Sequence, residues 1–314
     1  MSRHPEHVPV MPNEVKASFE VMPDGTFVDV TLGMGGHSIR ILREIPGIRR
    51  FVGIDRDTEI LAIARERMQD IPVELFFVHG NFRDMKDLLP PGTEEDVAGI
   101  LADLGISTLQ LDTPERGFAF QSDAPIDMRM DRSQEKSAYH VINEYSEDQL
   151  SKILREWGEV RGARRIAQEI VRERGAEPIG TTGQFARTIS KLVPDRFLNK
   201  ELARIFQAIR IEVNDELSAL EKWLEDAVSL LVPNGVITVL SYHSLEDRIV
   251  KNRFREWARG CVCPPRLPVC QCGLAPVLRL PKQKLQRPTE EEVRANGRAR
   301  SARLRTAIRL AEAS

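Results

Sequence analysis

The 314-residue chain has no apolar stretch long enough to cross a bilayer, and residues 1–9 lack the apolar core of a signal peptide. It also lacks a large net charge, because 45 Lys and Arg are balanced by 47 Asp and Glu, which leaves a formal charge of -2. These absences predict a cytoplasmic protein without a membrane partner and exclude a globally basic nucleic-acid binder. Any contact with RNA must use a local basic surface.

Cysteine is scarce, and its few copies are confined to one segment: Cys261, Cys263, Cys270 and Cys272. The disulfides of a secreted protein are usually spread through the fold, so this cluster is not a disulfide framework. A structural Zn²⁺ site and reduced thiols in a proline-rich loop both remain open. Zinc ribbons usually use C-x-x-C pairs with a longer gap, so the C-x-C spacing favours reduced thiols without a metal.

A glycine-rich turn follows the first predicted strand, residues 26–30. Gly33, Gly35 and Gly36 precede an amphipathic helix that we expect from His37. Glycines let a ligand approach the backbone closely, although an ordinary strand-to-helix turn has the same composition. The third glycine of the dinucleotide fingerprint is missing, which favours a nucleoside cofactor over a dinucleotide.

Two carboxylates stand at matching strand ends. Asp55 follows the apolar run 51–54, and Asp103 follows the run 97–102. Asp55 occupies the position at which Rossmann-like units place the carboxylate that accepts from ribose hydroxyls. Together with the glycine-rich turn, the two carboxylates at these strand ends indicate a methyltransferase.

Strands and helices alternate from residue 26 to residue 103, which predicts a parallel sheet. The sequence is then helical, with capping boxes predicted at Ser146 and Thr181 and a long helix after Asn199. Strand character returns at residues 235–240. We therefore predict a Rossmann-like α/β domain that is interrupted by an all-α insert.

The predicted α/β domain is discontinuous and comprises residues 1–112 and 214–314. The predicted insert, residues 113–213, is the expected substrate-binding domain. Lysines and arginines are concentrated in residues 279–314, where we expect a basic tail. Such a run is available to RNA, but for a charge run alone a solvated helix face and tail is the favoured explanation.

Several segments resemble the RsmH (MraW) family of bacterial S-adenosylmethionine-dependent methyltransferases: residues 28–38, 53–57, 110–118, 127–131 and 242–248. The resemblance extends over almost the whole chain. It implies a methyltransferase domain interrupted by a helical substrate-binding domain. It also implies N4-methylation of a cytosine in 16S rRNA, at the decoding centre of the assembled small ribosomal subunit.

The resemblance implies a set of cofactor contacts: Gly35, Gly36, His37, Asp55, Phe82, Asp103 and Gln110. Without it, Phe82 would be taken as a core aromatic rather than a partner for the adenine ring. The chain departs from the family at Leu109, where a proline is usual, at Gly297, where a proline is frequent, and at Tyr242, where Phe is common. These departures affect loop rigidity and stacking.

A cytosine amine is a poor nucleophile because its lone pair is delocalised into the ring, so positioned hydrogen-bond acceptors should do much of the catalysis. We predict Asp103 as the acceptor, with Ser107 or His243 as a second group. Asp103 can instead serve the cofactor alone. His243 can instead lie at a helix start that Ser244 and Asp247 cap.

The target base is expected to leave its stack and to rest on an aromatic or guanidinium surface of the insert. The candidates for that surface are Arg116, Phe118, Arg129 and Arg132. Asp127 and Asp131 are expected to pair with these arginines rather than to hold a metal.

Other functions remain open on the sequence. A DNA or small-molecule methyltransferase is disfavoured because the chain lacks an Asp/Asn/Ser-Pro-Pro-aromatic turn. The glycine turn alone also fits a dinucleotide oxidoreductase, and the basic segment fits a non-enzymatic RNA-binding module. The sequence leaves the oligomeric state open, a homodimer included.

Overall fold

The structure is a computed structural model that describes residues 9–264, 267, 269 and 271–311. The chain divides into two compact units, each with its own hydrophobic core. Unit 1 comprises Met1–Gly105 and Ser218–Ser314, and unit 2 comprises Ile106–Leu217. Unit 2 therefore extends beyond both ends of the predicted insert, residues 113–213.

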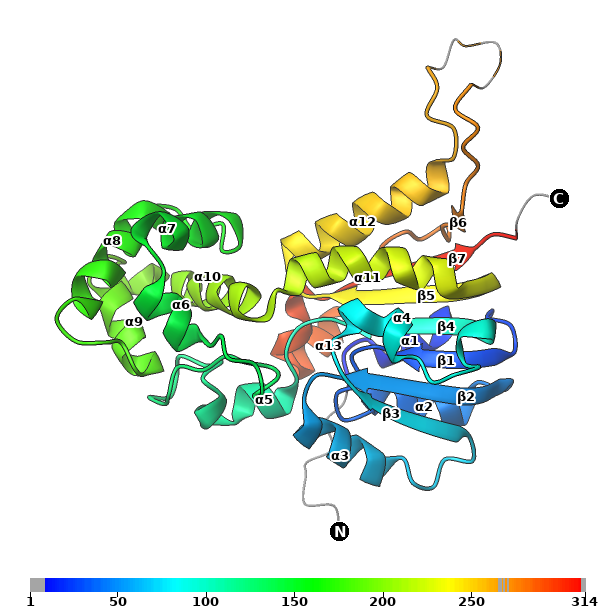
Figure 1. Ribbon diagram of the computed structural model, residues 1–314, viewed down its shortest axis with the longest axis horizontal. Helices are drawn as coiled ribbons and strands as arrows, with labels where there is room; N and C mark the ends of the chain where they lie inside the picture. The colour runs from blue at the N-terminus through cyan, green and yellow to red at the C-terminus, as the bar shows by residue number, and fades with distance from the viewer. Residues whose placement is uncertain (1–8, 265–266, 268, 270, 312–314) are drawn as a thin grey trace. The chain divides into compact units, whose positions relative to one another are not determined.

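Unit 1 is built on a seven-stranded sheet with the order β3-β2-β1-β4-β5-β7-β6 (Figure 1). The first five strands run parallel, and β7 runs antiparallel to β5 and β6. The strands are β1 (Gly25–Asp29), β2 (Ile48–Asp55), β3 (Glu74–His79), β4 (Val97–Asp103), β5 (Leu231–Ser241), β6 (Leu278–Arg279) and β7 (Arg303–Arg309).

Helices cover both faces of this sheet (Figure 1). Phe27 and Val28 are neighbours on β1 and enter different cores, because successive strand residues point to opposite faces. Phe27 packs with α1 (Pro12–Ser18), α2 (Gly36–Glu44) and α3 (Thr58–Arg67), while Val28 packs with α4 (Met85–Leu88), α11 (Glu216–Leu230) and α12 (Ser244–Arg259). The predicted fold class is confirmed.

Unit 2 is helical, and none of its residues lies in a strand of the sheet. Its helices are α5 (Thr108–Asp112), α6 (Ala138–Glu144), α7 (Glu147–Glu156), α8 (Ala163–Arg174), α9 (Thr182–Ser190) and α10 (Asp195–Asn214). The capping boxes predicted at Ser146 and Thr181 are confirmed. Helix α10 begins at Asp195, before the predicted start, and Pro194 is its N-cap with φ -59° and ψ 142°.

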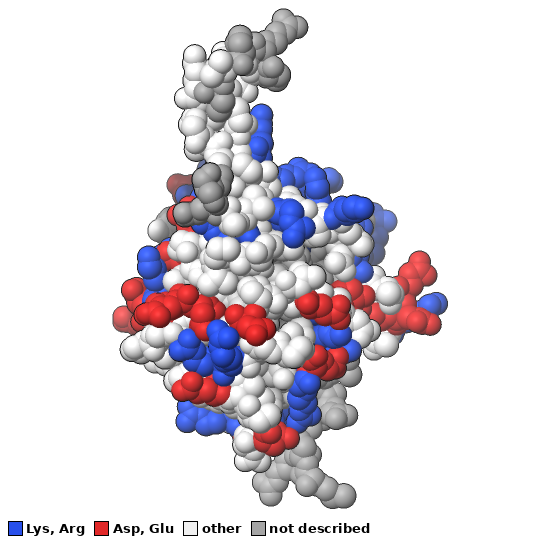
Figure 2. Space-filling view, turned by 90° about the vertical axis from the view of Figure 1, so that its right-hand side faces the viewer, with Lys and Arg blue, Asp and Glu red and all other residues white. Residues whose placement is uncertain are grey.

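The segment expected as a basic tail is folded. It contains α13 (Glu290–Ala295) and β7, whose Leu304, Ala307 and Ile308 are buried. In Figure 2, Lys and Arg gather over the upper part of the face shown, and Asp and Glu form a band below them. Among the helices that the structure describes, none combines the length and apolarity needed to span a bilayer.

Candidate functional site

The turn after β1 is fixed by a buried carboxylate. Asp29 is only 2% exposed, and its Oδ2 accepts a hydrogen bond of 2.5 Å from the Ser38 hydroxyl on α2. Its Oδ1 accepts from the Thr31 amide at 3.1 Å. Burial raises the pKa of Asp29 to about 7, although both hydrogen bonds favour the ionised form. Asp29 therefore ties the end of β1 to the start of α2.

The glycines expose backbone in this turn. Gly33 and Gly35 have positive φ values of 52° and 75°, in the left-handed region that favours glycine. A Cβ built on Gly33 would meet only the Thr31 carbonyl oxygen, at 3.9 Å, so space is open beside that residue. Gly35 is the N-cap of α2 and offers no side-chain cap to the first amides of the helix. The turn thus presents backbone groups to a ligand.

Asp55 joins the ends of β1 and β2. Its Oδ2 accepts from the Gly33 amide at 2.8 Å, and its Oδ1 accepts from the Asp57 amide at 2.9 Å. Burial raises the pKa of Asp55 to about 6, against the effect of these amides. The carboxylate is thereby oriented at the strand end where Rossmann-like folds hold a ribose.

Asp103 ends β4, and its backbone amide donates to Thr31 Oγ1 at 2.6 Å. Its Oδ1 accepts a hydrogen bond of 2.8 Å from the Tyr242 hydroxyl, and its Oδ2 lies 3.6 Å from His37 Nε2. Burial raises the pKa of Asp103 to about 7, and the charges of Asp29 and Glu246 add to the rise. Its side chain is nevertheless 28% exposed and so remains accessible.

Three carboxylates thus stand at the carboxyl ends of adjacent parallel strands: Asp29, Asp55 and Asp103. Such a concentration of negative charge suits a nucleoside cofactor that carries positive charge, and Asp55 and Asp103 are the members that a ligand can contact. It is unsuited to the pyrophosphate of a dinucleotide, whose negative charge the carboxylates would repel. The residues present therefore fit S-adenosylmethionine, whose sulfonium and ammonium groups are cationic.

His243 is the N-cap of α12, so the predicted cap on Ser244 with Asp247 is wrong by one residue. Its Nδ1 accepts from the Glu246 amide at 3.5 Å, and Glu246 Oε2 accepts from the Tyr242 amide at 2.9 Å. His243 Nε2 lies 3.1 Å from Glu246 Oε1. Glu246 therefore fixes both His243 and the backbone of Tyr242.

Phe82 lies just after β3, in the short helix η1 (Phe82–Asp84), which Asn81 caps. Its ring contacts the buried ring of Trp223 edge to face, with centroids 5.9 Å apart and planes at 81°. Phe82 is partly exposed at a strand end of unit 1. A partly exposed ring that is held on one side by another aromatic ring can stack on a nucleobase with its exposed part.

Ser107, a predicted catalytic residue, and Gln110, a predicted cofactor contact, form a capping box in unit 2. The Ser107 hydroxyl accepts from the Gln110 amide at 3.1 Å, and the Gln110 side chain accepts from the Ser107 amide at 3.1 Å. Gln110 is buried. The structure therefore shows both residues ordering the start of α5.

Two residues predicted to form the RNA surface are buried in unit 2. Arg116 is 3% exposed and donates to the carbonyl oxygens of Arg129 and Met130 at 3.0 and 2.9 Å. Phe118 belongs to the core of the unit. These two expectations are corrected: a guanidinium that finds carbonyl acceptors can be buried, and it then orders the loop instead of contacting RNA.

The other two residues predicted to form the RNA surface, Arg129 and Arg132, lie on the loop that Arg116 orders. Arg129 forms the predicted ion pair with Asp127, with hydrogen bonds of 2.8 Å from both Nε and Nη2, and this pairing lowers the pKa of Asp127. Arg132 is exposed. Asn214, which was not among the predicted site residues, accepts from the Met130 amide at 2.9 Å and so holds this loop.

The roles of Tyr242 and Glu246 were not predicted from the sequence. Tyr242 departs from the residue common in the family, and a phenol just after a strand is a hydrogen-bond donor placed at the sheet edge. Glu246 is three residues after His243, and this spacing is that of a capping box. The sequence therefore contains the donor and the capping spacing, but it does not identify Asp103 as the partner of the phenol.

A family model described as the MraW methylase family matches residues 4–310. Ribosomal RNA small subunit methyltransferase H of Clostridioides difficile (strain 630) is 44% identical over 307 residues, which cover 97% of this chain and 99% of that protein. The protein of that name from Symbiobacterium thermophilum is 44% identical over 310 residues, 97% of this chain and 96% of that protein. The chain therefore belongs to the MraW methylase family, and S-adenosylmethionine is its cofactor.

Proposed function

We propose that the protein methylates N4 of a cytosine in 16S rRNA, at the decoding centre of the small ribosomal subunit. The observation that carries the reaction type is Asp103, an accessible carboxylate at the end of β4 that Tyr242 orients. The names of the relatives support ribosomal RNA of the small subunit as the substrate. The cytosine N4 position and the decoding centre follow from the family resemblance of the sequence.

The cofactor supplies an electrophilic methyl group on its sulfonium sulfur when it is bound. The open backbone at Gly33 and the left-handed turn at Gly35 support a role for this turn in holding the methionine end. Asp55 is placed to accept from ribose hydroxyls, and Phe82 is partly exposed for the adenine. The proposed cofactor contacts are Gly35, Gly36, His37, Asp55, Phe82, Asp103 and Gln110.

Asp103 would accept an N–H hydrogen bond of the target amine. The ionised carboxylate accepts this hydrogen bond more strongly than the neutral acid and so leaves more electron density on the amine nitrogen. The amine loses one proton after it gains the methyl group, and only the ionised carboxylate can take that proton. A pKa raised to about 7 suits both tasks, since a general base works best when its pKa is near the working pH. His243 is a weaker candidate because it is buried and caps α12. Ser107 Oγ accepts from the Gln110 amide and has a second lone pair, so Ser107 stays a second candidate for the acceptor.

The exposed side chain of Arg132, beside the Asp127–Arg129 pair, is our candidate for contact with RNA in unit 2. A guanidinium stacks on unpaired bases and pairs with phosphate, so it suits a base that has left its stack. Arg129 is occupied by Asp127 and by the carbonyl oxygens of Arg132 and Gln134. It therefore acts by holding the loop that carries Arg132.

The test follows labelled methyl groups from S-adenosylmethionine to small ribosomal subunits that lack the modification. Naked 16S rRNA and DNA serve as parallel acceptors, and nucleoside mass analysis identifies the product. We expect N4-methylcytidine on the subunits and little label on DNA. Label on another atom of the RNA, or transfer to DNA alone, would contradict the proposal. Retention of RNA without any transfer would favour a binding module instead.

A further inference from the structure

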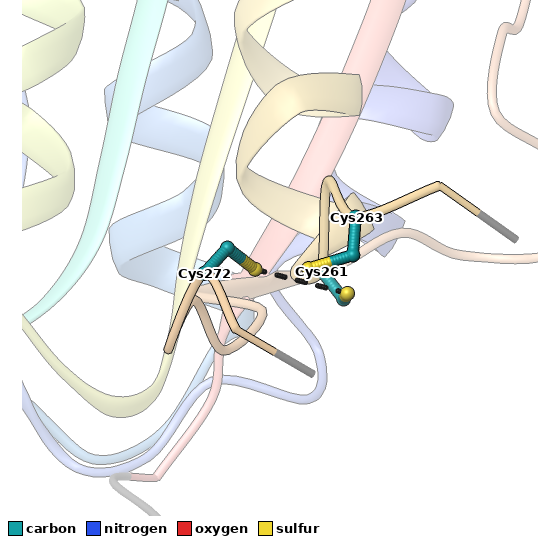
Figure 3. A group of neighbouring side chains, drawn as sticks. All are labelled: Cys261, Cys263 and Cys272. Atoms are coloured by element: carbon teal, nitrogen blue, oxygen red, sulfur yellow. Dashed lines mark hydrogen bonds between the residues drawn. The ribbon is translucent and has the colours of Figure 1, made fainter. Parts of the chain in front are cut away.

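The loop 260–277 joins α12 to β6 and carries every cysteine of the chain. The sulfurs of Cys261, Cys263 and Cys272 all lie within 4.8 Å of one another. Figure 3 shows the three side chains as neighbours. Cys270 lies outside the described residues. Helix α12 separates this cluster from His243 by 16 residues, or about 24 Å of helix. The cluster is therefore distinct from the site at the strand ends.

The spacing of one pair of these sulfurs matches that of two ligands on a tetrahedral metal ion. A Zn–S bond is about 2.3 Å long, so two sulfurs on a tetrahedral zinc are about 3.8 Å apart. The Sγ atoms of Cys261 and Cys272 are 3.7 Å apart. A disulfide would bring them to about 2.05 Å. Two thiolates on one iron of an iron–sulfur centre lie equally close, so iron in place of zinc in the purified protein would overturn the assignment to zinc.

The donor chemistry also indicates zinc. Thiolates are soft ligands, which Ca²⁺ and Mg²⁺ do not select, and a tetrahedral set of sulfurs is typical of Zn²⁺. The backbone amide of Gln271 donates to the sulfur of Cys263 at 3.3 Å. Such an N–H···S bond disperses the negative charge of a thiolate and is the kind of outer contact that orients a metal ligand.

The loop has little else to order its outer part. Its base is held, because the Val277 amide donates to the Trp257 carbonyl oxygen at 2.7 Å and Leu278 is buried. Beyond that base no described residue lies in a helix or strand, and the side chains of Val262 and Leu274 are 55% and 54% exposed. Figure 1 shows this segment extending past the end of α12. A segment without a core needs a cross-link to be ordered.

We propose that Cys261, Cys263 and Cys272 bind a structural Zn²⁺ ion as thiolates. Their protons are released to solvent when the metal binds, and no electron transfer is involved. The ion links residue 261 to residue 272 and so orders the loop. The C-x-C spacing in the sequence favours reduced thiols without a metal. The proximity of the three sulfurs in the structure favours a metal site.

The first test measures the metal content of the whole chain. The protein is expressed in zinc-supplemented medium and purified without chelator. Elemental analysis should find about one zinc per chain. Exchange with Co²⁺ should give the charge-transfer absorption of thiolate-bound cobalt. The double variant Cys261→Ser/Cys272→Ser should lose both signals, and the matched control Val262→Ser, exposed between two of the ligands, should keep them. Equal zinc in the double variant and the wild type would overturn the proposal.

A second measurement uses the wild-type protein, so it does not depend on how the variants fold. Titration with a thiol-specific mercurial should release zinc in step with the loss of thiols, as a metallochromic dye reports. Binding of S-adenosylmethionine should stay within about twofold of its starting value, because the site at the strand ends is remote. A wild-type protein that binds neither zinc nor cobalt, or that shows a Cys261–Cys272 disulfide by mass, would also overturn the proposal.

Discussion

The Tyr242 hydroxyl donates a hydrogen bond of 2.8 Å to Oδ1 of Asp103. Tyr242 directly follows β5 and Asp103 ends β4, so the bond connects two neighbouring strand ends. It favours the ionised carboxylate, while burial favours the neutral acid. Phe, which is common at this position in the family that the sequence resembles, cannot make this bond. Tyr242 thus tunes Asp103 in this chain.

We expect Tyr242→Phe to raise the pKa of Asp103 further, by about one unit, because a hydrogen bond to a charged group is worth about 1.5 kcal/mol or more. The cationic cofactor binds the ionised carboxylate better, so its affinity should rise with pH through this pKa. The midpoint of that rise should therefore move to higher pH in the variant. Calorimetric titration across neutral pH measures the midpoint, and an unchanged midpoint would show that the bond does not tune Asp103.

Asp103→Asn keeps the shape of the side chain and removes its charge. We expect the rate of methyl transfer at saturating cofactor to fall by about 100-fold or more, since general base catalysis contributes at least that much. Cofactor affinity should fall less, by about tenfold. Glu66→Gln, on the exposed side of α3, is the matched control. Weak cofactor binding with undiminished transfer at saturation would restrict Asp103 to holding the cofactor.

The strand ends of the site could be predicted from the sequence. Asp55 and Asp103 each follow a continuous apolar run, which is the pattern of a strand buried on both faces. Parallel strands then bring their carboxyl ends to one edge, so the two carboxylates could be assigned to one site. The contact between Tyr242 and Asp103 could not, because it depends on β5 pairing with β4 across an insertion.

Other parts escaped prediction for identifiable reasons. Strand β7 lies in an arginine-rich stretch, where charge obscures the buried Leu304, Ala307 and Ile308. Arg116 was expected at the surface because of its charge, but carbonyl oxygens supplied by residues 129 and 130 allow its burial. Both cases depend on partners that are distant in the sequence. Local patterns give no information about such partners.

Asp55→Asn should weaken cofactor binding by about 10- to 100-fold, because charged hydrogen bonds to the ribose become neutral ones. Without cofactor, the amide of Gly33 or Asp57 also loses its acceptor in the variant, so the role of the charge is read from the pH dependence of stability rather than from its absolute value. The folded pKa of Asp55 is raised to about 6, so the wild type loses stability as pH rises from about 4, the unfolded pKa, to about 6. The variant should lose less over that range. Urea unfolding at both ends of the range measures this, and parallel pH profiles would contradict it.

His243 can be tested as a cap separately from any catalytic role. Asparagine is a strong N-cap and alanine is a poor one, so His243→Ala should cost about 1 kcal/mol of stability and His243→Asn about 0.5 kcal/mol or less. If capping is its role, the asparagine variant should also retain methyl transfer. Thermal unfolding and initial rates of both variants provide the comparison. A folded His243→Asn protein that cannot transfer methyl groups would return His243 to the catalytic residues.

Asp247 holds the C-terminal strand to α12. Its Oδ1 accepts from Arg305 Nε at 2.7 Å, and its Oδ2 accepts from Arg303 Nη1 at 2.8 Å. Asp247 and Arg305 are largely buried, so Asp247→Ala leaves cationic groups without their acceptor. We expect the variant to lose about 2–4 kcal/mol of stability at neutral pH, somewhat less than a fully buried pair would cost.

The pH dependence separates this loss from a loss of packing. The arginine partners hold the pKa of Asp247 below its usual value, against the effect of burial. The stabilisation is therefore complete above about pH 4, the unfolded pKa, and is lost as pH falls through the lower folded pKa. The difference between wild type and Asp247→Ala should shrink as pH falls below about 4 in urea unfolding. A difference that is independent of pH would mean that packing around Asp247, and not its charge, holds β7 to α12.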